Sequence, residues 1–118
     1  MFASKLESTV RDIPGGRAAI IMGFDGIPLE SYPGEDGLDI ETMGMELSVV
    51  LKEVRKASEL LAVGDTEEVT VRTDQVTAIL RIVNHDYFMI LALSPQGNLG
   101  KARYALRILA PQLSIELA

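Results

Sequence analysis

Hydrophobic residues recur along this chain with two spacings, one typical of helices and the other typical of strands. Steps of three and four residues predict a first helix that ends before Pro14 and a long helix that runs from the cap residue Asp39 to about Val63. The same spacing predicts a last helix that begins after the cap residue Asn98. Pro111 lies within this last segment, so we expect it to kink or interrupt the helix.

Five stretches with the character of strands separate these helices: residues 18–24, 27–32, 68–73, 76–83 and 87–93. The run YFMILAL is apolar at every position and predicts a central strand, whereas the alternating run EEVTVRT and the proline of the second strand, Pro28, predict the two edges. The order α-ββ-α-βββ-α therefore predicts an α/β (α+β) fold, a five-stranded antiparallel sheet with helices on both faces.

The stretch FDGIPLES could serve ligand binding or only a turn. An Asp-Gly pair between two apolar runs is typical of a two-residue hairpin loop of type I′, in which both central residues adopt positive φ. We therefore interpret Asp25 and Gly26 as structural residues.

The long helix has two apolar faces. One stripe is expected to face the core, and it consists of Ile40, Met43, Leu47, Val50, Val54, Ala57 and Leu61. A second stripe of Met45, Val49 and Leu60 lies well round the helix from the first. The helix could be sandwiched inside one domain, but so short a chain has few elements left to cover the second face. We therefore favour a partner or a second copy of the chain.

Composition narrows the class of protein. The 118 residues predict one domain, spanning 1–118, and 47% hydrophobic with 24% charged residues is a globular balance. No apolar run approaches the length of a membrane span and no secretory signal is evident, so we expect no membrane insertion and a cytoplasmic protein. The absence of cysteine excludes disulfides and thiolate sites. A net charge of −6 argues against nucleic acid as a partner.

The candidate chemical motifs are incomplete. The segment PQGNLGKA resembles the end of a P-loop, but Pro95 replaces its first glycine and Ala102 replaces its hydroxyl residue. The acidic residues 35–41 lack the spacing of a calcium loop, and the one histidine, His85, lies in a predicted turn. We therefore expect no catalytic residues, no metal site and no cofactor, and predict that the chain is not an enzyme.

The chain resembles the Roadblock/dynein light chain family over nearly its whole length, and within it the bacterial branch exemplified by the gliding-motility regulator MglB. The residues that carry the resemblance are the hairpin GFDGIPLESY with Asp25-Gly26-Ile27 at its turn, the three-strand block, and a last helix that opens with Leu99-Gly100. The profilin-like Roadblock fold that this implies agrees with the predicted element order.

The resemblance also implies a function. Family members form homodimers through the long middle helix and the first strand of the three-strand block, bind a small Ras-like GTPase, and modulate its nucleotide cycle without doing covalent chemistry themselves. The expected dimer interface comprises Met45, Val49, Leu60, Val69 and Val71. The expected partner-binding residues are the flanking polar residues Lys52, Arg55, Lys56 and Glu59.

Two other functions remain open on the sequence alone. One is a structural dimeric adaptor that has no effect on any GTPase. The other is a small-ligand sensor on a similar scaffold.

Overall fold

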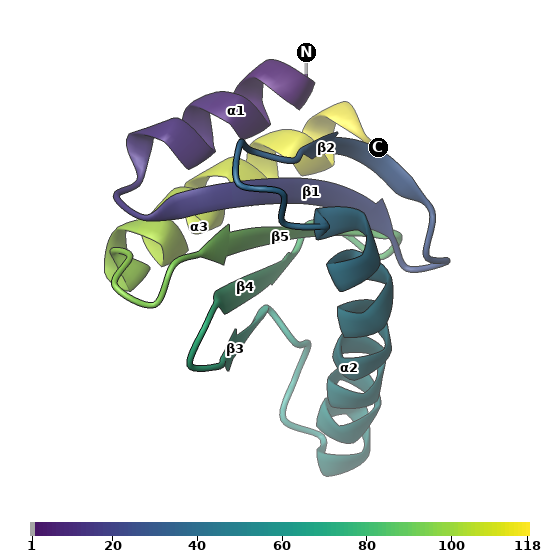
Figure 1. Ribbon diagram of the computed structural model, residues 1–118. Coiled ribbons are helices and arrows are strands. Elements are labelled where there is room, and N and C mark those ends of the chain that lie inside the picture. The colour runs from purple at the N-terminus through teal and green to yellow at the C-terminus, as the bar shows by residue number, and fades with distance from the viewer. Residues whose placement is uncertain (1) are drawn as a thin grey trace.

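The computed structural model describes residues 2–118 and contains the eight elements in the predicted order. Figure 1 shows helices α1 (Phe2–Asp12), α2 (Ile40–Leu61) and α3 (Leu99–Glu116) with strands β1 (Gly16–Gly23), β2 (Pro28–Tyr32), β3 (Glu68–Arg72), β4 (Thr77–Ile82) and β5 (Tyr87–Leu93).

The five strands form one antiparallel sheet in the order β2-β1-β5-β4-β3. The central position of β5 and the edge positions of β2 and β3 confirm the predictions made from apolar runs, alternation and Pro28. In β5 every residue after Tyr87 is buried. Continuous burial on both faces explains why this strand is apolar throughout.

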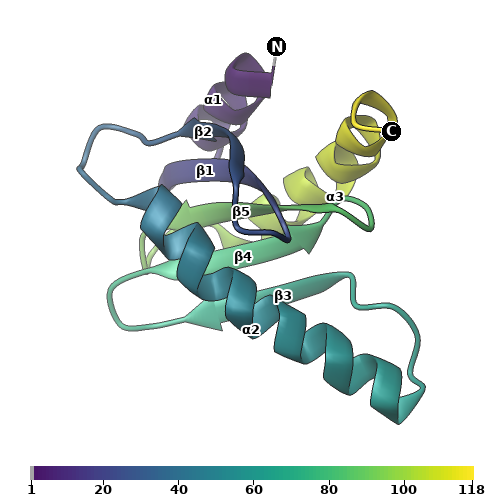
Figure 2. The ribbon, with the colours of Figure 1, turned by 90° about the vertical axis from the view of Figure 1, so that its right-hand side faces the viewer.

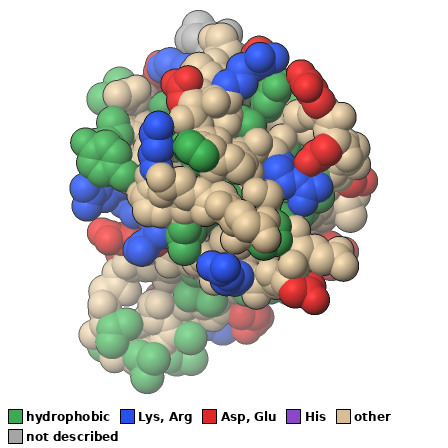
Figure 3. Space-filling model, turned by 60° about the vertical axis from the view of Figure 1, so that its left-hand side comes forward, with side chains coloured by type: hydrophobic (Ala, Val, Ile, Leu, Met, Phe, Trp, Pro, Cys, Tyr) green, Lys and Arg blue, Asp and Glu red, His purple; other side chains and the backbone are tan. Residues whose placement is uncertain are grey.

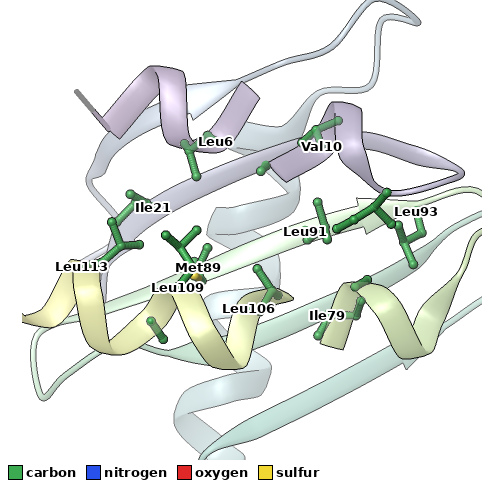
Figure 4. Packing of buried hydrophobic residues seen from close by; sticks show 14 residues of the cluster. Leu6, Val10, Ile21, Ile79, Met89, Leu91, Leu93, Leu106, Leu109 and Leu113 are labelled. Carbon is green, nitrogen blue, oxygen red and sulfur yellow. The ribbon is translucent and has the colours of Figure 1, made fainter. Parts of the chain in front are cut away.

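Helices cover both faces of the sheet, with α2 on one side and α1 and α3 on the other (Figures 1 and 2). Alternate strand residues point to opposite faces. Ile21, Met89 and Leu91 therefore pack with α1 and α3, as Figure 4 shows, while their neighbours Ile20 and Ile90 pack on the side of α2.

The two predicted helix caps are confirmed. The Asp39 carboxylate accepts a hydrogen bond from the Thr42 backbone N–H at 3.0 Å, and the Asn98 side chain accepts one from Lys101 N–H at 3.0 Å. The expected interruption at Pro111 is wrong, because α3 continues through it to Glu116. Ala110 and Leu113, on either side of Pro111, are buried in the cluster between the sheet and α1 and α3, and this packing supports a continuous helix.

The turn between β1 and β2 differs from the predicted type I′ turn. Gly26 has φ +86°, whereas Asp25 does not have positive φ. The Gly26 N–H donates to Gly23 O, and the Gly23 N–H donates to Ile27 O, each at 3.0 Å. These bonds define a three-residue loop with glycine at its left-handed position. Asp25 is structural, as expected, since its carboxylate accepts a hydrogen bond from the Ile27 backbone N–H.

Candidate functional site

Helix α2 is longer than the part of the sheet beneath it. Its 22 residues extend about 33 Å, whereas five strands span only about 19 Å from the axis of one edge strand to that of the other. The helix crosses the sheet diagonally from β1 toward β3, and its C-terminal half projects past the sheet (Figures 1 and 2). Its buried residues are Ile40, Gly44, Ser48 and Leu51, and none follows Leu51.

The first half of α2 lies close to β1 because a glycine faces the strand. A Cβ atom added at Gly44 would meet the terminal methyl of Met22 at 2.8 Å. This contact anchors the N-terminal half on the sheet. The direction of the C-terminal half therefore follows from how the N-terminal half is anchored on β1.

Part of the stripe predicted to face the core is on the surface. Val50 and Ala57 are exposed, and 70% of Leu61 is accessible, whereas Ile40 is buried and Leu47 is half-buried. The buried face comprises Gly44, Ser48 and Leu51, and none of these residues belongs to the predicted stripe, so the core-facing side was placed too far round the helix. Val50 is exposed beside the buried Leu51, whereas Leu61 is exposed at the end of α2 that projects past the sheet. Figure 3 shows apolar side chains gathered on the projecting lower end of the molecule.

The second predicted stripe is also exposed. Met45, Val49 and Leu60 all lie at the surface, with 57% of Val49 accessible. Val50 and Leu61 lie on the side of the helix that follows on from Leu47, which packs in the same cluster as Val69 and Val71 of β3. Helix α2 thus carries more exposed apolar surface than the sequence indicated, along its length and at its projecting end.

The outer edge of β3 has unpaired backbone groups. Ile82 N–H donates to Glu67 O at 3.1 Å, and Thr73 N–H donates to Val76 O at 2.9 Å. Because hydrogen-bonded residues alternate along an antiparallel pair, the odd-numbered residues from 67 to 73 bond to β4. The N–H and C=O groups of Glu68, Thr70 and Arg72 consequently point away from the sheet.

The four predicted partner-binding residues are not equally available. The Arg55 guanidinium is half-buried and lies 4.1 Å from the centre of the Phe24 ring. Lys56 forms an exposed ion pair with Glu53 at 3.6 Å. Lys52 and Glu59 are exposed. Among these four residues, only Arg55 makes an intramolecular contact stronger than an exposed ion pair.

The acidic residues near the start of α2 have structural partners. A hydrogen bond from Arg17, at 2.5 Å, lowers the pKa of Asp36, and the hydrogen bond from the Thr42 N–H lowers the pKa of Asp39. His85 is exposed. Within residues 2–118 no three His, Asp or Glu side chains are grouped so that they could hold a metal ion. No helix in the same range has the length and apolar character needed to cross a membrane.

The sequence did not identify Leu61 as a surface residue, although one signal was present. A helix of more than 20 residues cannot lie wholly over the few strands available in a chain of this length. Comparing the predicted helix length with the predicted sheet width would have indicated that one end projects.

Comparisons with known proteins agree with this geometry. MglC from Myxococcus xanthus is 38% identical, with 96% of each chain covered and a TM-score of 0.69. A Roadblock/LC7 domain from Streptomyces avermitilis is 15% identical over 97% of this chain and 95% of that one, with a TM-score of 0.86. A structure of MglB in a tetrameric arrangement is 17% identical over 94% of this chain and 83% of that one, with a TM-score of 0.83.

Neither the family models nor the curated proteins include a match to the sequence. The two structures at 15% and 17% identity support the fold alone. The likeness to MglC, at 38% identity over almost the full length of both chains, supports common descent. The chain belongs to the Roadblock/LC7 family, among its bacterial MglB-like members.

Proposed function

We propose that residues 1–118 form one Roadblock-like domain that works as a homodimeric regulatory or adaptor module, binds a small Ras-like GTPase and modulates its nucleotide cycle. The observation that carries this proposal is the exposed apolar half of α2 beside the open edge of β3. An uncovered helix face next to an open strand edge suits a partner that supplies both a strand and a helix.

A second copy of the chain meets this requirement. If a twofold axis perpendicular to the sheet relates the two copies, both α2 helices lie on the same face of the joined sheet. Even-numbered residues of one β3 then pair with even-numbered residues of the other. Centred on Thr70, the axis aligns the outward N–H and C=O groups of residues 68, 70 and 72 with those of the partner strand. Moving the axis to Val69 or Val71 would leave some of these groups unpaired. Thr70 is therefore the proposed centre of a continuous sheet.

The exposed apolar residues of each α2 would cover the other copy. Val50 and Leu61 lie on the side of the helix that follows on from Leu47, which packs in the same cluster as Val69 and Val71, and Met45, Val49 and Leu60 lie farther round the helix. Val69 and Val71, half-buried in the monomer, would become fully covered at the junction. The proposed interface thus keeps the residues expected from the sequence and adds Val50 and Leu61.

The GTPase partner follows from the family resemblance, with Lys52, Arg55, Lys56 and Glu59 as the proposed contact residues. The described residues contain no group of three His, Asp or Glu side chains that could hold a metal ion. We propose that the module changes hydrolysis or exchange by repositioning groups of the GTPase, and is not itself an enzyme.

A structural adaptor is the second candidate. It is favoured by the state of Arg55 and Lys56, whose side chains contact Phe24 and Glu53 within the same chain. An adaptor would bind its partner and leave the nucleotide cycle unchanged.

The deciding experiment is a GTP hydrolysis and nucleotide-release assay with a small Ras-like GTPase from the same organism. A regulator changes at least one of the two rates in a saturable manner. Saturable binding with both rates unchanged would establish an adaptor instead. Absence of binding to any Ras-like GTPase recovered from the same cells would overturn the proposal.

A further inference from the structure

A polar hollow lies on the other face of the molecule from α2. Its volume is about 640 Å³, and one wall is α3 while the other is the segment between α2 and β3. Helix α3 lies behind β5 and β4, and β3 extends past it (Figure 2). The lining residues are Asp65, Glu67, Glu68, Arg81, Gly100, Arg103, Tyr104 and Arg107.

The Glu68 carboxylate in this hollow contacts two arginines, and it lies much closer to one than to the other. Glu68 Oε2 accepts a hydrogen bond from Arg103 Nε at 2.7 Å and forms an ion pair with Arg103 Nη2 at 2.6 Å. Its other oxygen is 3.7 Å from Arg81 Nη1, which is too long for a hydrogen bond. Glu68 is therefore committed to Arg103, and Arg81 receives only a weak ionic contact.

The arginine with the weaker contact is the more buried one. Only 17% of the Arg81 side chain is exposed, against 56% of the Arg103 side chain. Arg81 Nε is inaccessible to solvent and has no hydrogen-bond partner within residues 2–118. A buried N–H group of a charged side chain without a partner is unfavourable, whereas Arg103 could be solvated if Glu68 left it.

We propose that the exposed Arg103, together with Arg107 one helical turn later, receives a carboxylate from an acidic segment of a partner protein, and that Glu68 then turns to Arg81 and accepts from its Nε. The exchange replaces one intramolecular carboxylate at Arg103 by one from the partner. It gives Arg81 the hydrogen bond that it lacks in the free protein. Arg103 therefore stays paired, and the gain is the hydrogen bond at Arg81, which does not itself meet the partner.

The lining favours a protein carboxylate over a phosphate. Asp65 and Glu67 line the hollow and form no ion pair with its arginines among the described residues, so they would oppose a ligand with concentrated negative charge. A single carboxylate matches the group that Arg103 already holds. The Arg107 guanidinium lies 5.4 Å from the Tyr104 ring centre, which provides an apolar surface beside the charge.

The test uses fluorescence anisotropy of the full chain with a labelled hexapeptide of alternating glutamate and serine, in which the carboxylates are spaced apart, at low ionic strength. Arg103→Ala should abolish binding and Arg107→Ala should weaken it. Glu68→Gln removes the internal competitor and should strengthen binding by about fivefold or more. The matched control is Glu67→Gln, which makes the same change in net charge at a neighbouring lining residue and should change affinity by less than about twofold.

If Glu68→Gln and Glu67→Gln strengthened peptide binding equally, the effect would come from net charge alone. The proposed movement of Glu68 from Arg103 to Arg81 would then be overturned. Failure of the wild type to bind the peptide, or unchanged binding by Arg103→Ala, would also overturn it. Displacement of the peptide by inorganic phosphate at a similar concentration would show a general anion site instead. The direct signature is the NMR signal of Arg81 Hε, which should shift and exchange more slowly with water as the peptide saturates. An unchanged signal at saturation would contradict the movement of Glu68.

Discussion

Gly26 determines the geometry of the first hairpin through its φ of +86°. A Cβ atom there would meet no neighbouring atom within 4 Å, so a substitution acts only through the backbone. We expect Gly26→Val to lower the free energy of unfolding by about 1 kcal/mol or more, because a β-branched residue resists positive φ. Urea denaturation measures this change.

Asp25→Asn is the matched variant in the same turn. Asparagine retains an oxygen that can accept from the Ile27 N–H, so the variant should unfold at nearly the same urea concentration as the wild type. Loss of partner or metal binding by this variant at unchanged stability would contradict the structural role of Asp25.

Ala62 is the one non-glycine residue with positive φ between residues 2 and 118. It ends α2 at φ 54° and ψ 43°, and the Val63 N–H donates to Ser58 O behind it. This is a position where glycine is preferred. Ala62→Gly should stabilise the protein by about 0.5 kcal/mol, the relief of strain exceeding the added freedom of the unfolded chain.

The control for Ala62→Gly is Ala57→Gly in the exposed interior of the same helix. There the alanine has ordinary helical geometry, so glycine should destabilise by about 1 kcal/mol. Thermal denaturation of both variants provides the comparison. A shift of both melting temperatures in the same direction would refute the assignment of strain to Ala62.

At the scale of elements, β3 is the strand on which the proposed continuous sheet depends. Thr70→Pro removes an N–H group that points away from β4, so the monomer should retain its fold. The same change removes the central bonds of the proposed junction and should shift the molar mass measured by light scattering from dimer to monomer. Thr70→Val, which keeps the N–H, should remain dimeric. If the proline variant dimerised as tightly as the valine variant, β3 pairing would be excluded.

The sequence predicted correctly those features that depend on neighbouring residues in the chain or on burial of a whole strand. The apolar run of β5 indicated its central position, and the caps Asp39 and Asn98 marked where two helices begin. Pro111 was misjudged because packing of its neighbours against the sheet outweighs the lost hydrogen bond, and such packing is not visible in a local pattern. The exposure of Val50 depends on which face of α2 meets the sheet, and that of Leu61 on where the sheet ends, and both are tertiary properties.

The candidate site was predictable only in part for the same reason. The periodicity indicated an exposed stripe at Met45, Val49 and Leu60, and these residues are exposed. Arg55 was placed with exposed polar residues, but its contact with Phe24 joins residues 31 positions apart in the chain, since 55 − 24 = 31. The uneven sharing of Glu68 between two arginines joins three separate elements and leaves no mark on the sequence pattern.

For the whole molecule, the proposed function predicts that no arginine of this chain acts as an inserted catalytic finger. Arg55→Ala should weaken GTPase binding and leave the maximal stimulated rate unchanged, because the proposed contact is for docking. Replacing each other arginine by alanine in turn completes the series. A fall of roughly 10³-fold in the maximal rate with intact binding would identify a catalytic arginine and reject the docking role.

Self-association through the uncovered half of α2 is the central claim, and sedimentation velocity with single charge substitutions tests it most directly. At about 50 μM the wild type should sediment as a dimer, while Leu61→Glu and Val49→Glu should sediment as folded monomers, because each would bury unpaired like charges near the twofold axis. The control is Ile108→Glu on exposed α3, which should stay dimeric. A monomeric wild type, or dimers in all three variants, would contradict the account.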